Sequence, residues 1–121
     1  MSAGIALISQ LQKTNPYEQL ELTIQNFLNA ISKSLETKGI DFAYNASGGM
    51  FGFFFSKKLP ENFEDVCATD SKVFQKFFIK SLSKGIYFAP SKFEAGFLST
   101  THVDEVMQSA SQKVLDAIEE L

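Results

Sequence analysis

Neither arginine nor tryptophan occurs in this chain of 121 residues, and cysteine and histidine occur once each. A single cysteine, Cys67, cannot form a disulfide framework or a thiolate zinc site within one chain, which fits a reducing compartment. A single histidine, His102, excludes a histidine pair, so we expect no metal site. Eleven lysines against fourteen acids give a net charge of −3, so we expect no nucleic-acid partner.

Long apolar runs are also missing. No stretch approaches the ~20 residues of a membrane span, and the N-terminus lacks the basic start and apolar stretch of a secretion signal. We therefore expect a cytoplasmic protein without a membrane partner. Phenylalanine, in contrast, is abundant: thirteen occur in a chain that is 45% hydrophobic and 21% charged. This composition predicts one globular domain with an aromatic core.

The first clear helix signal begins at Asn15, which we expect to cap the helix while Pro16 occupies its first turn and Glu18 completes a capping box. Apolar residues then recur on one face as far as Gly39, which can adopt the left-handed conformation that ends a helix. A further apolar pattern at helical spacing precedes this helix, over residues 2–11, and begins without a cap.

Two more helices are predicted later in the chain. Asp70 can cap a helix that Gly85 closes, and its expected inward residues are Val73, Phe74, Phe77, Phe78 and Leu82. A last helix begins near Val103, and its expected inward residues are Val106, Met107, Ala110, Val114, Ile118 and Leu121. His102 lies at the start of this helix, where a hydrogen bond to the helix end is favoured over a catalytic role.

Two aromatic-rich runs, residues 41–45 and 50–56, flank a glycine-containing turn and predict an antiparallel strand pair. Phe51, Phe53 and Phe55 point to one face of the second run and Met50, Gly52 and Phe54 to the other, so both faces need cover. Residues 57–69 predict a loop, 86–88 a brief strand and 89–99 irregular structure. This order predicts a small α+β fold, with helices on one face of a mainly antiparallel sheet.

Glu94 is the best candidate for a functional residue, because it interrupts the apolar segment 93–97, where burying a charge is costly without a partner or a purpose. Strand-like alternation allows another interpretation, in which Glu94 faces solvent while Phe93 and Ala95 face inward. Both interpretations stay open on the residues alone. The glycines of 48–52 lack the helix and the Lys-Ser/Thr pair of a phosphate loop, so they are interpreted as a turn.

Residues 48–55 (GGMFGFFF), residues 85–97 (GIYFAPSKFEAGF) and His102 together resemble a known family. They are similar to the C-terminal domain of the glutamate-1-semialdehyde 2,1-aminomutases, which are pyridoxal 5'-phosphate enzymes of the class III aminotransferase group, and the resemblance spans essentially the whole chain. It implies a fold-type I homodimer that converts glutamate-1-semialdehyde to 5-aminolevulinate for tetrapyrrole (porphyrin) synthesis. It also implies that residues 1–14 are a truncated interdomain helix and 15–121 the C-terminal small domain.

By the same resemblance, the large cofactor-binding domain is a missing partner, and with it the Schiff-base lysine and the phosphate-binding residues. We therefore expect no pyridoxal phosphate on this chain, expect the chain alone to be inactive, and interpret Lys92 as exposed. Related transaminases commonly carry an arginine here to hold a substrate carboxylate, whereas the matching position is Glu94. The resemblance thus implies that Glu94 lies at the active-site rim and faces substrate.

The start of the last helix and an alternative function are also open to prediction. The family usually has Ser or Thr after the histidine as a helix cap; the residue here is Val103, so capping would pass to Thr101 or His102. A hypothesis from a different class is a free-standing α+β interaction module without catalysis, whose apolar face binds a partner.

Overall fold

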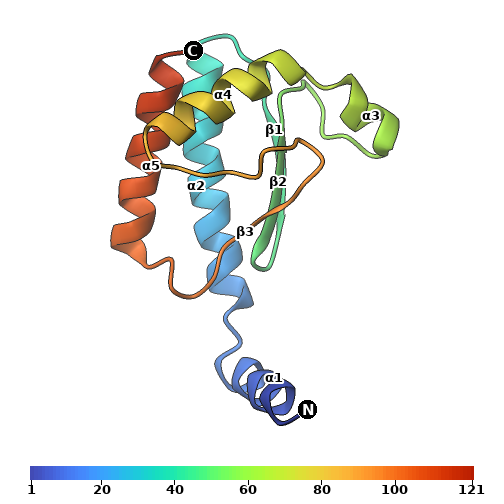
Figure 1. The fold of residues 1–121 in the computed structure, drawn as a ribbon, viewed down its shortest axis with the longest axis vertical. Coiled ribbons are helices and arrows are strands. Elements are labelled where there is room, and N and C mark those ends of the chain that lie inside the picture. Colours follow the sequence, from blue (N-terminus) through green and yellow to red (C-terminus); the bar gives the residue numbers. More distant parts are fainter.

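The computed structural model describes residues 1–121 and contains five helices and a three-stranded sheet. In chain order the elements are α1 (Ser2–Thr14), α2 (Tyr17–Thr37), β1 (Ala43–Ser47), β2 (Met50–Phe54), α3 (Phe63–Ala68), α4 (Ser71–Ser83), β3 (Gly96–Phe97) and α5 (Asp104–Glu119). Figure 1 shows α2, α4 and α5 gathered beside the hairpin, while α1 extends away at the N-terminal end. The predicted small α+β fold is confirmed.

The sheet is antiparallel, and β2 is its central strand. Ser47 pairs with Met50, so the turn between β1 and β2 consists of two glycines, and Gly48 has the positive φ of 55° that the first residue of a tight hairpin turn requires. The third strand is not 86–88, as the sequence suggested. It is the two-residue strand β3, which pairs with the start of β2.

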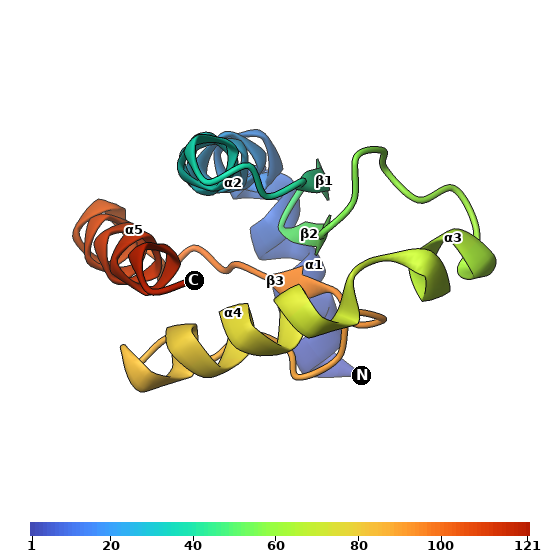
Figure 2. The same cartoon turned by 90° about the horizontal axis from the view of Figure 1, so that it is seen from above.

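The core lies between one face of this sheet and the helices α2, α4 and α5, which Figure 2 shows around one side of the strands, with α3 beyond them. Phe53 is the centre of an aromatic cluster. Its ring contacts five others, with centroid distances of 5.4 to 6.2 Å: those of Phe42, Phe55, Phe74, Phe77 and Phe88. Phe88 therefore packs into the core, while residues 86–88 pair with no strand and β3 occupies the edge of β2 at Met50 and Phe51.

Asn15 has a different role from the predicted one. Its φ is 38°, in the left-handed region, and its N–H donates to the Leu11 carbonyl at 2.8 Å. Asn15 thus ends α1, and Pro16 takes the N-cap position of α2 without a side-chain bond. Asparagine tolerates left-handed backbone better than most residues, so the same side chain that suits an N-cap also suits this C-terminal position.

The expected loop over residues 57–69 contains the short helix α3. The side chain of Asn62 accepts a hydrogen bond from the Asp65 N–H at 2.9 Å, and the Asp65 carboxylate accepts one from the Glu61 N–H at 3.1 Å. This reciprocal arrangement is close to a capping box. The Asn-x-x-Asp spacing was therefore a usable signal, but no apolar period accompanied it.

The other helix predictions are largely confirmed. Asp70 caps α4 by accepting from the N–H groups of Lys72 and Val73, and Gly85 follows α4 with a φ of 86°. The inward stripes differ by single positions: Leu82 and Val106 are exposed, whereas Ser81 and Ala117 are buried. Ser81 and Ala117 are small, and they lie in the region where α5 packs closely against α2 and α4.

The start of α5 also differs from expectation. Val103 is its N-cap residue, with no side-chain bond, so neither Thr101 nor His102 caps the helix. The His102 Nδ1 instead accepts a hydrogen bond from the Ser99 N–H at 3.0 Å, within the connection between β3 and α5.

A charge cluster joins the C-terminal ends of α4 and α5. Glu120 accepts a hydrogen bond from the Lys80 ammonium at 2.9 Å and contacts Lys84 with its other oxygen. The bond from Lys84, followed by that from Lys80, lowers the pKa of Glu120 to about 2, and Glu120 in turn raises the pKa of Lys84.

The lowered pKa of Glu120 predicts a specific pH dependence of stability. A group of this kind stabilises the fold above its unfolded-state pKa of 4.5 and loses that contribution as the pH falls towards about 2. We expect Glu120→Gln to melt below the wild type at pH 7, and the difference to shrink between pH 4.5 and 2. Thermal unfolding followed by circular dichroism measures both, with Glu36→Gln as an exposed, unpaired control. A difference that is constant over this pH range would contradict the assignment.

Candidate functional site

Glu94 lies in the turn that leads from Phe88 into β3. Its N–H donates to the Ser91 carbonyl at 3.1 Å, and the Phe93 N–H donates to the Ser91 hydroxyl oxygen at 3.2 Å. The Glu94 side chain is exposed, and its carboxylate takes part in none of the three ion pairs. Phe93 and Ala95, which alternation would turn inward, are exposed as well, so this turn does not alternate.

A close approach at Gly96 fixes the C-terminal side of this turn. Gly96 pairs with Phe51 of β2, and a Cβ atom added to Gly96 would lie 2.2 Å from the Phe51 ring. Only glycine allows β3 to lie so close to this ring. The Leu98 N–H then donates to the Gly49 carbonyl at 2.8 Å, which extends the pairing beyond β3.

Helix α3 contacts the other side of the turn. Phe63 of α3 stacks on Phe93, with centroids 5.3 Å apart and an interplanar angle of 28°. The ammonium of Lys92 donates to the carbonyls of Cys67 and Thr69, both at 3.0 Å. Lys92 is therefore half-buried and hydrogen-bonded, and the prediction that it is exposed was wrong. Its partners lie 25 and 23 residues away in the sequence, so the residues next to Lys92 gave no sign of them.

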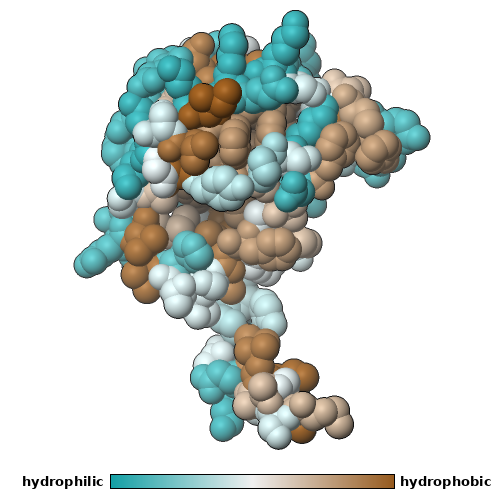
Figure 3. Space-filling view, in the orientation of Figure 1, coloured by the Kyte–Doolittle hydropathy of each residue, from teal (hydrophilic) through white to brown (hydrophobic).

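The outer face of the hairpin stays open next to this turn. A groove of about 270 Å³ lies on the face to which Met50, Gly52 and Phe54 point, and Leu59, Pro60 and Ala95 border it. The need for cover on both faces of β2 is thus met on one face only: Phe51 is buried, whereas Met50 is 45% exposed. Figure 3 shows further apolar residues at the surface near α3 and along α1.

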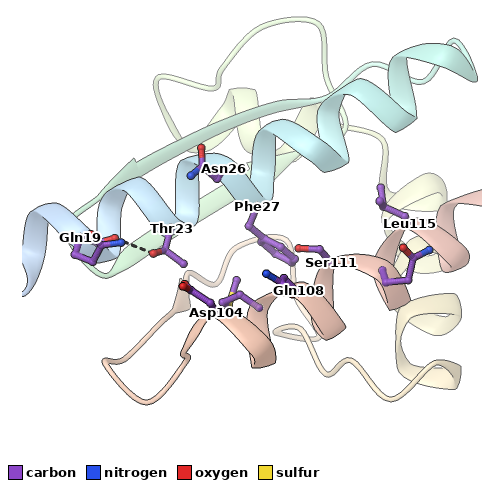
Figure 4. Close-up of a pocket in the computed structure, with 10 residues that line it drawn as sticks. Gln19, Thr23, Asn26, Phe27, Asp104, Gln108, Ser111 and Leu115 are labelled. Atoms are coloured by element: carbon purple, nitrogen blue, oxygen red, sulfur yellow. Dashed lines mark hydrogen bonds between the residues drawn. The ribbon is translucent and has the colours of Figure 1, made fainter.

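A second hollow, of about 460 Å³, lies between α2 and α5. Figure 4 shows Gln19 and Thr23 of α2 opposite Gln108 and Ser111 of α5, with the Phe27 ring between them. Most of the lining is polar and uncharged, and no residue of the Glu94 turn takes part. Asp104 is the one charged residue of this lining, which contains no histidine or lysine to activate the Thr23 or Ser111 hydroxyl.

Comparison with curated proteins identifies the relatives of the chain. The glutamate-1-semialdehyde 2,1-aminomutase of Legionella pneumophila (strain Paris) is 41% identical over 120 residues, which cover 98% of this chain and 27% of that protein. The enzymes of the same name from Chlamydia muridarum and Aquifex aeolicus are 37% and 35% identical over 99% and 100% of the chain. The resemblance to the glutamate-1-semialdehyde 2,1-aminomutases is confirmed. The chain spans 27% to 28% of the length of these relatives.

A solved structure described as a transaminase with PLP bound contains a segment with the same fold as this chain. The TM-score is 0.70 over 92% of this chain and 24% of that chain, at 16% identity, so the likeness concerns the fold alone. No family model matches the chain. The fold class predicted from the sequence thus agrees with that of a segment of a larger transaminase.

The remaining candidate groups do not assemble into a site. Cys67 is exposed on α3 and His102 bonds to the main chain of its own loop. No group of three or more His, Cys, Asp or Glu side chains could hold a metal ion. None of the helices has the length and apolar character needed to cross a membrane. The candidate that remains in this aminomutase-like chain is Glu94, on the turn that lies between Gly96 and the contacts with α3.

The contact between Gly96 and Phe51 predicts an asymmetric response to added methyl groups. Gly96→Ala forces the Phe51 ring or β3 to move, so we expect a loss of about 1–3 kcal/mol in the free energy of unfolding. Gly52→Ala on the same sheet is the matched control, since its Cβ would meet the nearest side-chain atom at an ordinary 3.6 Å. Chemical denaturation measures both. Equal effects would show that the close approach does not constrain β3.

Proposed function

We propose that this chain is the C-terminal domain of a glutamate-1-semialdehyde 2,1-aminomutase, and that the full-length protein converts glutamate-1-semialdehyde to 5-aminolevulinate in tetrapyrrole synthesis. The observation that carries the proposal is the 41% identity over 98% of the chain. The protein so proposed is a cytoplasmic homodimer, in which residues 1–14 belong to an interdomain helix and 15–121 form the small domain.

The exposure of α1 supports this division. No residue of α1 is buried, and the side chains of Ile5, Leu7 and Ile8 are 65%, 61% and 59% exposed. An apolar helix without cover is unusual in a protein that folds as one unit, because contiguous exposed apolar surface usually marks an interface. The relatives supply the length needed for such cover, since most of their sequence lies outside the matched region.

Pyridoxal phosphate, when bound to the full-length enzyme, supplies the electron sink for moving an amino group between carbons. The residues around Glu94 do not fit this cofactor. Lys92 is the lysine of this turn, and its ammonium lies 3.0 Å from each of two carbonyls; the chain has no arginine to bind a phosphate. The cofactor-binding residues in this proposal are therefore those of the large domain.

We assign to Glu94 the role of a substrate-facing residue at the active-site rim of the full-length enzyme. Its carboxylate is exposed and outside the ion pairs of the chain, while its backbone is held by Ser91 and lies two residues from β3. A fixed negative charge can orient the amino groups of the substrate, and it disfavours ligands that would present a carboxylate at the same place.

The alternative is a free-standing interaction module that binds a partner in the open groove beside Met50 and Phe54. The apolar lining of this groove favours it. The aminomutase proposal also accounts for the open groove, however, because other parts of a longer protein would cover it. The identity to much longer enzymes makes the aminomutase proposal the stronger one.

Kinetics of the full-length enzyme test the role of Glu94. Glu94→Gln keeps the shape of the side chain and removes its charge, so we expect nearly unchanged folding and a loss of about 1.5–3 kcal/mol in transition-state stabilisation, or about one to two powers of ten in kcat/KM. Glu105→Gln, at another exposed acid, is the control. Wild-type kinetics together with a shifted melting temperature would remove Glu94 from the site.

Borohydride trapping tests the absence of a cofactor lysine on this chain. After incubation with pyridoxal phosphate and reduction, we expect weak labelling scattered over several of the eleven lysines, since eight are exposed and the other three are bound to Glu120 or to backbone carbonyls. Peptide mapping by mass spectrometry locates the label. Stoichiometric labelling of one lysine would overturn the assignment of the cofactor to the large domain.

A further inference from the structure

The carbonyls bound by Lys92 belong to the end of α3. The last carbonyls of a helix have no partner within the helix, so they need donors from elsewhere. The Lys92 ammonium supplies two such bonds, to Cys67 and Thr69, at 3.0 Å each. Lys92 forms no ion pair, since all three ion pairs of the chain involve other lysines. These carbonyls are therefore its main electrostatic partners within the chain.

The next residue makes a second contact with the same helix. Phe93 stacks on Phe63, the first residue of α3, and the Lys92 ammonium lies 5.5 Å from the centre of the Phe93 ring. Two consecutive residues of the turn thus bind both ends of α3, one through hydrogen bonds and one through ring stacking. An exposed turn would otherwise be expected to move, because few buried contacts restrain it.

Glu94 lies midway between two anchors. Lys92, two residues before it, is bound to α3, and Gly96, two residues after it, is bound to the Phe51 edge of β2. We propose that Lys92 is a positioning residue for the aminomutase reaction: by binding the end of α3, it fixes the turn that directs Glu94 towards the substrate. This inference rests on the proposed function, because it acts through the role assigned to Glu94.

Hydrogen exchange of the full-length enzyme tests the structural half of the proposal. Lys92→Met keeps the apolar stem and removes the ammonium, so we expect the amides of Phe93 and Glu94 to exchange about fivefold faster. Lys92→Arg keeps the positive charge and several N–H donors, so it should restore slow exchange. Lys76→Met, at an exposed lysine of α4, is the control. Unchanged exchange in Lys92→Met would overturn the proposal.

A double-mutant cycle in the same enzyme tests the functional half. We expect Lys92→Met to lower kcat/KM for glutamate-1-semialdehyde about tenfold, since small displacements of a positioned group are costly. In the Glu94→Gln background, Lys92→Met should cause no further loss, because the two residues act as one unit. Lys92→Arg should recover most of the activity.

The outcomes separate this proposal from the function on which it rests. An equal loss of kcat/KM in both backgrounds would overturn the positioning role, since Lys92 would then act on the substrate or on the fold independently of Glu94. A wild-type enzyme without aminomutase activity would overturn the proposed function instead. Hydrogen exchange would still decide in that case whether Lys92 orders the turn.

Discussion

The aromatic cluster around Phe53 is the constraint on which the rest of the structure depends. The five rings that contact Phe53 come from the segment before β1, from the residue after β2, from α4 and from the segment after α4. Aromatic pairs of this kind contribute about 0.5–1.5 kcal/mol each beyond their burial. Because β2 supplies the central ring, this strand is the best-fixed part of the sheet, and the segments paired with it inherit its position.

The candidate site is built outward from that strand. Gly96 packs closely against the ring of Phe51 of β2, and this contact fixes the end of the Glu94 turn. Helix α3 restrains the beginning of the turn through its contacts with Lys92 and Phe93. An exposed charge on a restrained backbone suits a residue that acts on a substrate delivered from another part of a protein. Such a group gains little from flexibility, since orientation is what makes its charge effective.

Local signals predicted the elements that local interactions form. The Asp70 cap, the glycines after α2 and α4, and a glycine-containing turn in the hairpin all act within a few residues, and the structure contains each of them. The turn is shorter than the predicted residues 46–49, because Ala46 and Ser47 belong to β1 and pair with β2. Strand β3 could not be predicted in this way, because two residues have no period and their place depends on the Phe51 ring. The hydrogen bonds of Lys92 could not be predicted for a related reason: the carbonyls that accept them become its neighbours only when α3 packs against the turn.

The exposed surfaces give the final link between fold and proposed function. Met50, Phe93 and Phe97 are all large, exposed and close in sequence or in sheet pairing to the Glu94 turn. Surfaces of this type favour burial against another protein part, and burial there would also remove water from the neighbourhood of Glu94. A charge interacts more strongly with a bound amino group when water is excluded, because the local dielectric constant falls. On the proposed function, the contacts that complete the domain and those that make Glu94 effective are therefore the same contacts.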